Sequence, residues 1–372
     1  MGDIITNCDK IMNVVVIGGG PIGCYAAYLL ASSGHKVEVY EEHSQIGAPI
    51  QCTGLLTEDF DQFNLPKDSF LINTLQNIVI NSSQKQLIIP KTEYLVCRKK
   101  FDNYMANLAL KAGAKIFLRH SFISGDSDKI IISDSLNQQK KELSPDLIIA
   151  ADGPLSKVAK SYDFYHPKRK MYHGMQALVR GKFNKNEYHT FFGKDVCNDL
   201  FAWIVPESDN VARVGLASLN NAKSKFDRFL KQQNVQAVEI QSGMIPLYHP
   251  QQKLKKDNCY LVGDSSGFVK ATTLGGIIPG MQQAKVLADC INNDKDYDIE
   301  SKHLHRKMKL HLRLRNIFNK FSDKDWNRLL VMLKKDTLQK VLKQYSRDNP
   351  IPLVSKAIIK EPKLLYFLKH LF

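Results

Sequence analysis

Near the start of the chain, the pattern of apolar and polar residues predicts a strand, a turn, a helix and a second strand, in that order. Four consecutive apolar residues at 14–17 predict a buried parallel strand. A glycine-rich turn follows, and the small apolar residues at 24–33 then predict a helix that lies on a sheet. Gly34 ends this helix, and residues 36–40 predict a second strand. This is the order of a βαβ nucleotide-binding unit.

The turn carries the dinucleotide fingerprint G-x-G-x-x-G at Gly18, Gly20 and Gly23. The first glycine allows a tight turn, the second lets backbone approach a pyrophosphate, and the third lets helix and strand pack closely. The pyrophosphate would sit at the helix N-terminus, whose free N–H groups attract an anion. Glu41 lies at the end of the second strand, where it would accept hydrogen bonds from an adenosine ribose. A carboxylate there disfavours a 2′-phosphate, so NAD or FAD is favoured over NADP.

The pattern changes in the middle of the chain and then returns. Residues 99–111 predict a helix and residues 147–151 a fully buried strand, as in an α/β domain. Residues 71–95 and 171–219 predict antiparallel strands instead, and 222–233 a helix. Strand, glycine loop and helix recur after residue 255. We therefore expect a discontinuous nucleotide-binding domain (12–70, 96–160 and 251–295) and a sheet domain inserted in it (71–95 and 161–250).

Residues 296–372 are expected to form a basic helical C-terminal domain. Apolar residues recur at helical spacing on one side of its first helix: Leu310, Leu314, Ile317 and Phe321. Basic residues fall on another side: Arg306, Lys309, Arg313 and Lys320. Residues 329–345 repeat the pattern, Pro350 and Pro352 are expected to break it, and Pro362 starts a last short segment.

Composition and charge narrow the function classes. The 372 residues predict two to three domains, and no apolar run approaches the roughly 18 residues of a membrane span. The seven cysteines are scattered and contain no C-x-x-C, which argues against a disulfide framework, a zinc site or an iron–sulfur cluster and favours the cytoplasm. Residues 301–372 hold a charge of +13 out of the total of +15. The charge therefore indicates a local anionic surface as partner, with no nucleic acid and no metal expected.

Three further points line up with the fingerprint: Arg98 heads a helix, Asp152-Gly153 follows a buried strand, and Gly263-Asp264 follows another. In this order they resemble the FAD-dependent enzymes with the aromatic-hydroxylase fold. Within that superfamily the chain is most similar to the geranylgeranyl reductase family. The similarity rests on the stretches PIQCTG (49–54), FAWIVP (201–206) and GDSSGFVKATTLGGI (263–277).

The resemblance implies an α/β fold: an FAD-binding Rossmann-like domain, an inserted antiparallel-sheet substrate domain and a C-terminal helical region. It implies FAD as cofactor. Asp264 would accept bonds from ribityl hydroxyls, and the N-terminus of the helix opened by 275–277 would stabilise anionic reduced flavin. The implied cofactor residues are Gly18, Gly20, Gly23, Glu41, Cys52, Gly54, Arg98, Asp152, Gly153, Gly263, Asp264, Gly275, Gly276 and Ile277.

The family's substrate motif is Y-x-W-x-F-P, then eight residues, then G-x-G. Here Phe201, Val205 and Ala217 replace Tyr, Phe and the last Gly, whereas the other three positions match: Trp203, Pro206 and Gly215. Strand alternation places the side chains of 201, 203 and 205 on one face, which is expected to line an apolar slot over the flavin. Aromatic residues of a neighbouring strand extend it: Tyr188, Phe191 and Phe192.

The implied reaction is reduction of isolated C=C bonds in geranylgeranyl chains, most simply on membrane ether lipid precursors, otherwise on a prenylated quinone or chlorophyll precursor. An electron-rich double bond accepts hydride at one carbon only if a proton reaches the other. Cys52, a held water or a pocket tyrosine would supply it, and Cys52 is the catalytic candidate. The sequence contains one dinucleotide fingerprint, which FAD would occupy, so no separate nicotinamide-binding domain is expected. Electrons are therefore expected from transiently docked NAD(P)H or a ferredoxin-like carrier.

Two other classes remain open from the sequence. A flavin-dependent monooxygenase or halogenase would share this fold, and the piece 201–206 is faintly similar to the W-x-W-x-I-P of flavin halogenases, with the first Trp missing. A basic, non-catalytic module that binds nucleic acid or membrane would take up no flavin. Because the expected substrate resides in a membrane, the basic C-terminus is expected to hold a cytoplasmic protein peripherally on an anionic bilayer.

Overall fold

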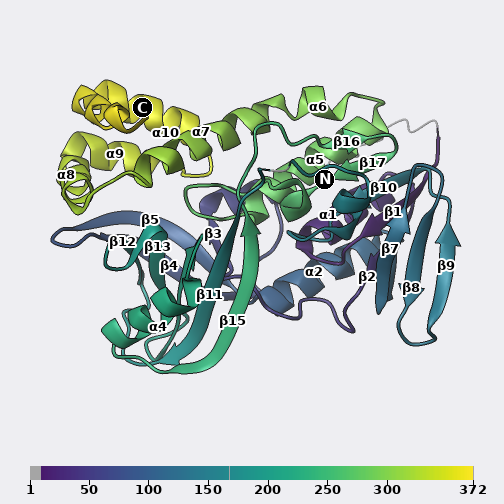
Figure 1. Ribbon diagram of the computed structural model, residues 1–372, viewed down its shortest axis with the longest axis horizontal. Coiled ribbons are helices and arrows are strands. Elements are labelled where there is room, and N and C mark those ends of the chain that lie inside the picture. The colour runs from purple at the N-terminus through teal and green to yellow at the C-terminus, as the bar shows by residue number, and fades with distance from the viewer. Residues whose placement is uncertain (1–9, 167, 372) are drawn as a thin grey trace.

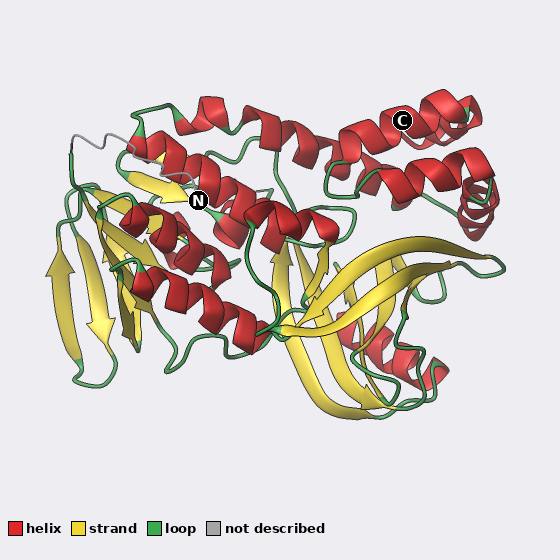
Figure 2. Ribbon diagram, turned by 180° about the vertical axis from the view of Figure 1, so that it is seen from behind, coloured by secondary structure: helices red, strands yellow, loops and turns green. Residues whose placement is uncertain are grey.

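The computed structural model describes residues 10–166 and 168–371, so Cys8 lies outside the described residues. Two sheets lie side by side, and helices of the last quarter of the chain run along the top of both (Figure 1). The view from behind shows the C-terminal helices on one side of the large, strongly curved sheet and a separate helix on its other side (Figure 2). The space between these parts positions the site.

The first sheet contains six strands in the described residues, in the order β16-β17-β10-β1-β2-β6. Its central strands are parallel, and the short β16 pairs antiparallel with β17. The strands are β1 (Asn13–Ile17), β2 (Lys36–Glu41), β6 (Lys115–Leu118), β10 (Leu147–Ala150), β16 (Lys255–Lys256) and β17 (Cys259–Leu261). The parallel strands β1, β10 and β17 are apolar almost throughout because both faces of the sheet are covered there.

Helices cover one face of this sheet and a small sheet covers the other. On the first face α1 (Pro21–Ser32) packs against α2 (Arg98–Lys111) and α5 (Ile277–Asn292). On the second face lie α3 (Lys157–Ser161) and a three-stranded sheet, formed by β7 (His120–Gly125), β8 (Ile130–Asp134) and β9 (Gln139–Leu143). The apolar pattern of residues 99–111 is thus explained, because Phe101, Met105 and Ala109 are fully buried.

The second sheet has eight strands in the described residues, in the order β15-β11-β14-β13-β12-β4-β5-β3. All neighbours are antiparallel except β12 and β4. Its strands are β3 (Leu55–Thr57), β4 (Leu71–Asn81), β5 (Gln86–Val96), β11 (Met171–Arg180), β12 (Glu187–Gly193), β13 (Cys197–Pro206), β14 (Val211–Ser218) and β15 (Ala237–Pro246). Helix α4 (Ala222–Gln232) covers one face through Phe226 and Phe229. The sequence pattern did not reveal β15, whose first four residues are exposed on the sheet edge.

The C-terminal helices lie over the other face of the large sheet. They are α6 (Tyr297–Glu300), α7 (Lys302–Phe318), α8 (Asp323–Leu333), α9 (Asp336–Gln344), α10 (Pro350–Lys360) and the 3₁₀ helix η3 (Pro362–Leu371). There are two shorter 3₁₀ segments: η1 (Glu58–Phe63) contacts β3 and β5, and η2 (Gly263–Ser266) contacts α5. None of the helices in the described residues is both long and apolar enough to cross a bilayer.

The predicted fold class is confirmed: an α/β Rossmann-like part, an antiparallel sheet between its segments, and a helical C-terminus. The predicted break at Pro350 and Pro352 is observed, because α9 ends at Gln344 and both prolines lie in the first turn of the next helix, α10. The first turn tolerates proline because its N–H groups have no partner within the helix. The domain bounds remain a prediction, which the pairing of β4 with β12 supports.

Candidate functional site

A cavity of about 1230 Å³ extends between the two sheets and the C-terminal helices. At one end its wall is the glycine turn after β1 together with the ends of β2 and β10. At the other end its wall consists of apolar side chains from α10 and η3. The cavity therefore joins a polar end to an apolar end.

The three fingerprint glycines have different surroundings at the polar end. Gly18 has a φ of +107°, and a Cβ there would lie 2.3 Å from the carbonyl oxygen of Ala151. A Cβ on Gly20 would meet nothing within 4 Å, because this residue lines the cavity. A Cβ on Gly23 would lie 2.1 Å from the carbonyl oxygen of Gly18, so Gly23 permits close packing and does not line the cavity. These are the places that a pyrophosphate-binding turn requires.

Glu41 lies beside this turn at the end of β2. Its carboxylate accepts hydrogen bonds from the backbone N–H of Gly19, at 2.7 Å, and of His43, at 2.8 Å. The carboxylate is 9% exposed and lines the cavity. These contacts fix it where an adenosine ribose would contact the turn.

The polar groups around this end fit FAD. Asp152 accepts the backbone N–H groups of Lys157 and Val158 through Oδ2, while its buried Oδ1 has no hydrogen-bond partner in the described residues. The buried hydroxyl of Thr273 likewise lacks a partner there. Both residues line the cavity, and Gly153, with a φ of +77°, has open space where a Cβ would be. Unpaired buried polar atoms facing an open cavity indicate a polar ligand.

Asp264 and the loop before α5 form the part of the wall where the flavin ring is predicted to bind, which we call the flavin end. Asp264 is at the cavity wall, and burial raises the pKa of its carboxyl group while Arg98 and Arg169 oppose that rise. A Cβ on Gly276 would lie 2.7 Å from Asp264 Oδ1, so any larger residue there would displace the Asp264 carboxylate. Helix α5 begins after Gly276 with no side-chain cap, which leaves its N-terminal N–H groups available to an anionic ligand. Gly263, with a φ of +70°, packs on Ile22 behind this wall.

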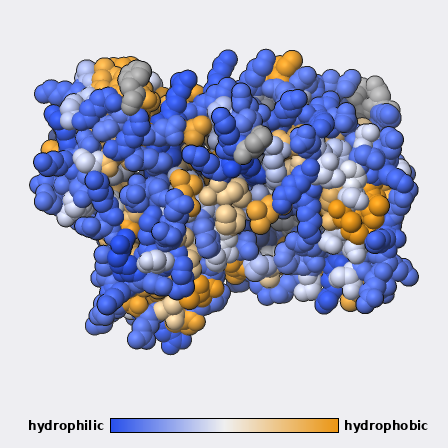
Figure 3. Space-filling view, in the orientation of Figure 1, coloured by the Kyte–Doolittle hydropathy of each residue, from blue (hydrophilic) through white to orange (hydrophobic). Residues whose placement is uncertain are grey.

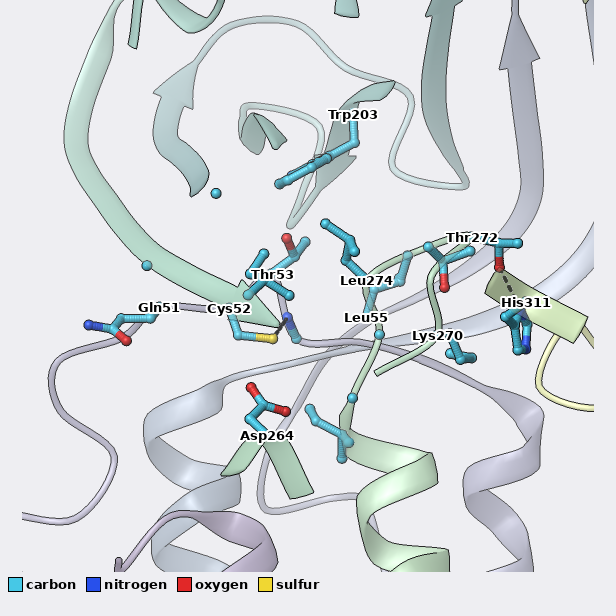
Figure 4. Close-up of a pocket in the computed structure, with 18 of the residues that line it drawn as sticks. Gln51, Cys52, Thr53, Leu55, Trp203, Asp264, Lys270, Thr272, Leu274 and His311 are labelled. Atoms are coloured by element: carbon cyan, nitrogen blue, oxygen red, sulfur yellow. Dashed lines mark hydrogen bonds between the residues drawn. The ribbon is translucent and has the colours of Figure 1, made fainter. Parts of the chain in front are cut away.

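Cys52 faces the cavity opposite Trp203, with Asp264 beyond it (Figure 4). Its Sγ accepts the backbone N–H of Gly54 at 3.4 Å. Arg98 lines the same wall and donates two hydrogen bonds of 3.0 Å to Asp102. Burial lowers the pKa of Arg98, but Asp102 and Cys52 outweigh this, so its pKa lies above the usual value. Arg98 is thus held in the site as a cation.

The predicted apolar face exists. The side chains of Phe201, Trp203 and Val205 all line the cavity, and the rings of Phe201 and Trp203 lie edge to face at 6.0 Å. Gly215 lies behind Trp203, where a Cβ would come within 2.6 Å of the indole ring. Pro206 lines a separate, smaller pocket near α4. Gly215 and Pro206 therefore lie outside the cavity wall, although they belong to the substrate motif.

The neighbouring strand β12 extends this face only in part. Tyr188 and Phe192 line the cavity as expected. The expectation for Phe191 was wrong: its ring packs at 5.3 Å against Phe229 of α4 on the opposite face of the sheet. Strand alternation places it there, since side chains of successive residues point to opposite faces.

Sequence reasoning missed a buried amide that connects Trp203 to the Cys52 loop. Gln176 accepts the indole N–H of Trp203 at 3.2 Å and the hydroxyl of Thr53 at 2.6 Å through one oxygen. Its Nε2 donates to Gln241 at 2.8 Å, which fixes the orientation of the amide. A lone glutamine in a strand gives no sequence signal for this role, because both partners lie far away in the chain.

Sequence reasoning also missed buried ionic groups on the wall below the C-terminal helices. Lys270 pairs with Asp348, which also accepts the hydroxyl of Thr57 at 2.7 Å. Arg347 pairs with Glu93 and donates to the hydroxyl of Tyr188 at 2.6 Å. Two residues of α7 complete the group: His311, 2.7 Å from Thr272 Oγ1, and Arg315, which donates to the carbonyls of Ala271 and Thr272.

Comparisons with known proteins show what this chain is similar to. A model of the NAD(P)-binding Rossmann-like domain matches residues 16–64. The digeranylgeranylglycerophospholipid reductase of Methanocaldococcus jannaschii is 27% identical, over 98% of this chain and 99% of its own length. A solved geranylgeranyl bacteriochlorophyll reductase-like structure from Thermoplasma acidophilum has a TM-score of 0.80 and 21% identity, with 98% of this chain and 100% of that chain covered. The flavin-dependent halogenase CmlS has a TM-score of 0.69 and 15% identity, over 96% of this chain and 79% of its own.

Fold, cradle and relatives together define the class: the chain is an FAD-dependent oxidoreductase. Its resemblance to the geranylgeranyl reductase family, predicted from three short motifs, is confirmed along nearly the whole chain by the reductase relative.

Proposed function

We propose that the protein reduces isolated C=C bonds of geranylgeranyl chains, carried on membrane ether lipid precursors. One observation supports this most directly: the cavity continues from the predicted cofactor cradle into a chamber lined by aliphatic side chains of the C-terminal helices. Such a chamber suits a long apolar chain, and a small polar substrate would leave its wall without contacts. The reductase relative carries such a substrate in its name.

FAD, when bound and reduced, supplies the hydride. The chain's own residues orient the substrate and supply the proton. Trp203, held by Gln176 and backed by Gly215, presents a flat apolar surface to the prenyl chain. The Sγ–H group of Cys52 faces the same space and is our candidate proton donor. Leu55 and Leu274 line the wall between Trp203 and Lys270 and exclude water there (Figure 4).

We further propose that the electron donor is a separate molecule, NAD(P)H or a ferredoxin-like carrier, and that the protein works in the cytoplasm, peripherally on a membrane. Residues 301–372 carry a charge of +13, which attracts anionic lipid headgroups. Each Lys or Arg near the membrane surface contributes about 1 kcal/mol to the free energy of membrane binding.

The test is anaerobic incubation of the dithionite-reduced holoprotein with geranylgeranyl lipids, followed by mass spectrometry. We expect the lipid mass to rise by pairs of hydrogen atoms. No gain on any prenyl substrate would refute the proposal, and oxygen consumption coupled to hydroxylation would identify a monooxygenase instead. Trp203→Ala should lower turnover while the protein keeps its flavin; loss of flavin would assign Trp203 a structural role.

A further inference from the structure

Exposed apolar side chains gather at the C-terminal end of the molecule. Sixteen large hydrophobic side chains are exposed in the part of the chain that the structure describes, and six of them lie between residues 351 and 371. Figure 3 shows hydrophobic side chains at this corner, above α8 to α10. We call these six residues the C-terminal apolar surface: Ile351, Ile359, Leu365, Tyr366, Leu368 and Leu371.

The geometry of the two helices aligns these side chains. In a 3₁₀ helix, residues three apart lie above one another, so Leu365, Leu368 and Leu371 form one row along η3. They are 46%, 40% and 43% exposed. In α10, Ile351 and Ile359 lie two turns apart on the same side, and only Pro350 of this apolar helix is buried.

The charges around this surface are cationic. Four lysines lie in the two helices: Lys356, Lys360, Lys363 and Lys369. Glu361, the one carboxylate within residues 350–371, is 7% exposed and pairs with Lys335. Tyr366 lies between the cations of Arg328 and Lys369, at 4.0 and 3.9 Å from its ring centre. Leucines, an interfacial tyrosine and lysines without exposed acids complement an anionic bilayer.

The same two helices form the apolar end of the cavity. Leu353, Val354, Ala357 and Ile358 line it from α10, and Leu364 and Phe367 from η3. Leu368 both lines the cavity and belongs to the C-terminal apolar surface, so we place the opening between the two at this residue.

We propose that α10 and η3 lie in the interface of an anionic bilayer and that a lipid chain passes between bilayer and cavity beside Leu368. The nature of that chain rests on the proposed function, whereas the bilayer contact does not. The surface exposes leucines toward the acyl chains, and the inner side of the same helices offers an apolar path to the flavin end.

Flotation with vesicles of phosphatidylglycerol and phosphatidylcholine tests the contact. The variant Ile359→Ser/Leu365→Ser/Leu371→Ser is expected to bind at least tenfold more weakly than the wild type. A matched control, Leu136→Ser/Val238→Ser/Ile240→Ser, removes three apolar side chains elsewhere that are 64%, 59% and 55% exposed, and it should bind within twofold of the wild type. Lys360→Ala should weaken binding roughly fivefold at low salt, the factor that corresponds to about 1 kcal/mol.

Leu368→Trp tests whether a lipid chain enters the cavity beside this residue, because the larger indole narrows the proposed opening and keeps its surface apolar. We expect kcat/KM for detergent-dispersed lipid to fall at least fivefold with vesicle binding within twofold of wild type; Leu136→Trp is the control. If this variant does not fold, Leu368→Phe takes its place. Unchanged kcat/KM would refute the proposal that lipid enters beside Leu368.

Two results would overturn the bilayer contact: triple-serine binding equal to wild type, or a change of oligomeric state with binding unchanged, which would identify an interface between copies. Vesicle binding that depends on the leucines, with no turnover in any preparation, would refute the proposed function and leave the bilayer contact standing.

Discussion

At the scale of single residues, Gln176 is the point where the substrate face and the Cys52 loop meet. One amide oxygen accepts both Trp203 and Thr53, and the residue is 6% exposed. A buried amide with every partner in place fixes the positions of its neighbours, and removing it leaves two donors unpaired. We therefore regard Gln176 as a positioning residue for the indole and for the loop.

Gln176→Leu should lower kcat/KM about tenfold and the free energy of unfolding by about 2 kcal/mol, with FAD content unchanged. The fluorescence of Trp203, isolated by Trp326→Phe since the chain has two tryptophans, should shift because the indole N–H loses its acceptor. Gln232→Leu, at an exposed glutamine of α4 that does not line the cavity, is the control. An emission spectrum identical to that of the parent would contradict this role.

His311 makes the stability depend on pH. Burial lowers the pKa of His311 to about 3, and nearby Lys270 acts in the same direction. Between this value and the unfolded pKa of about 6.5, the unfolded chain binds more protons, so stability falls as pH falls. For this residue alone, unfolding should cost about 2 kcal/mol less at pH 5 than at pH 7.5.

Urea titrations at the two pH values measure this dependence. His311→Asn should reduce the difference by that amount, and His303→Asn, an exposed histidine of the same helix, should not. An equal pH dependence in all three proteins would show that His311 is not its source.

At the scale of elements, α7 explains why the faces of a helix were only partly predictable. The apolar spacing predicted the helix itself, and the predicted basic residues Arg306, Lys309 and Arg313 are exposed. Arg315 and His311, however, point inward and are 1% exposed. Their partners are carbonyl and hydroxyl groups of the loop at 271–272, some forty residues earlier, and no local pattern contains that information.

Arg315→Met should weaken FAD binding about tenfold. It leaves the carbonyls of Ala271 and Thr272 without their donor, and this loop leads directly to Gly275 and Gly276 at the flavin end. Flavin fluorescence on titration of the apoprotein measures the affinity. Arg315→Lys keeps a cationic donor, so its FAD affinity should lie between those of the wild type and Arg315→Met. Equal affinities in all three proteins would show that the loop holds its shape without Arg315.

The loop before α5, which we call the flavin loop, is joined to the loop between α9 and α10 by a buried ion pair, and this pair gives a further prediction. Lys270→Met leaves Asp348 buried and without its cation, which should cost about 3–5 kcal/mol of unfolding free energy. Lys270→Met/Asp348→Leu should cost less, since paired charges are often replaceable by apolar groups. Chemical unfolding of both variants measures the two free energies of unfolding. A double variant as unstable as the single one would mean that the contact with Thr57 and the local packing, and not the unpaired charge, cause the loss of stability.

At the scale of the whole molecule, the cavity is built from segments spread between residues 17 and 368. The sequence was sufficient for the polar end, because residues at the carboxyl ends of parallel strands meet at one sheet edge. It was insufficient for the apolar end, since leucines and isoleucines of α10 and η3 have the pattern of ordinary core. The ionic pairs around Asp348 and Glu93 join β5, the flavin loop and the α9–α10 loop, and only the assembled fold brings these together.

Exposed side chains of opposite character line the two ends of the cavity. Exposed Glu42 and His43 line it at the nucleotide end, and exposed Leu368 lines it at the lipid end, toward the other end of the molecule (Figure 1). Under the proposed function and the proposed entry beside Leu368, cofactor and lipid use separate openings. A lipid would then exchange while the nucleotide stays bound, so the residence time of the cofactor would not limit the number of catalytic cycles.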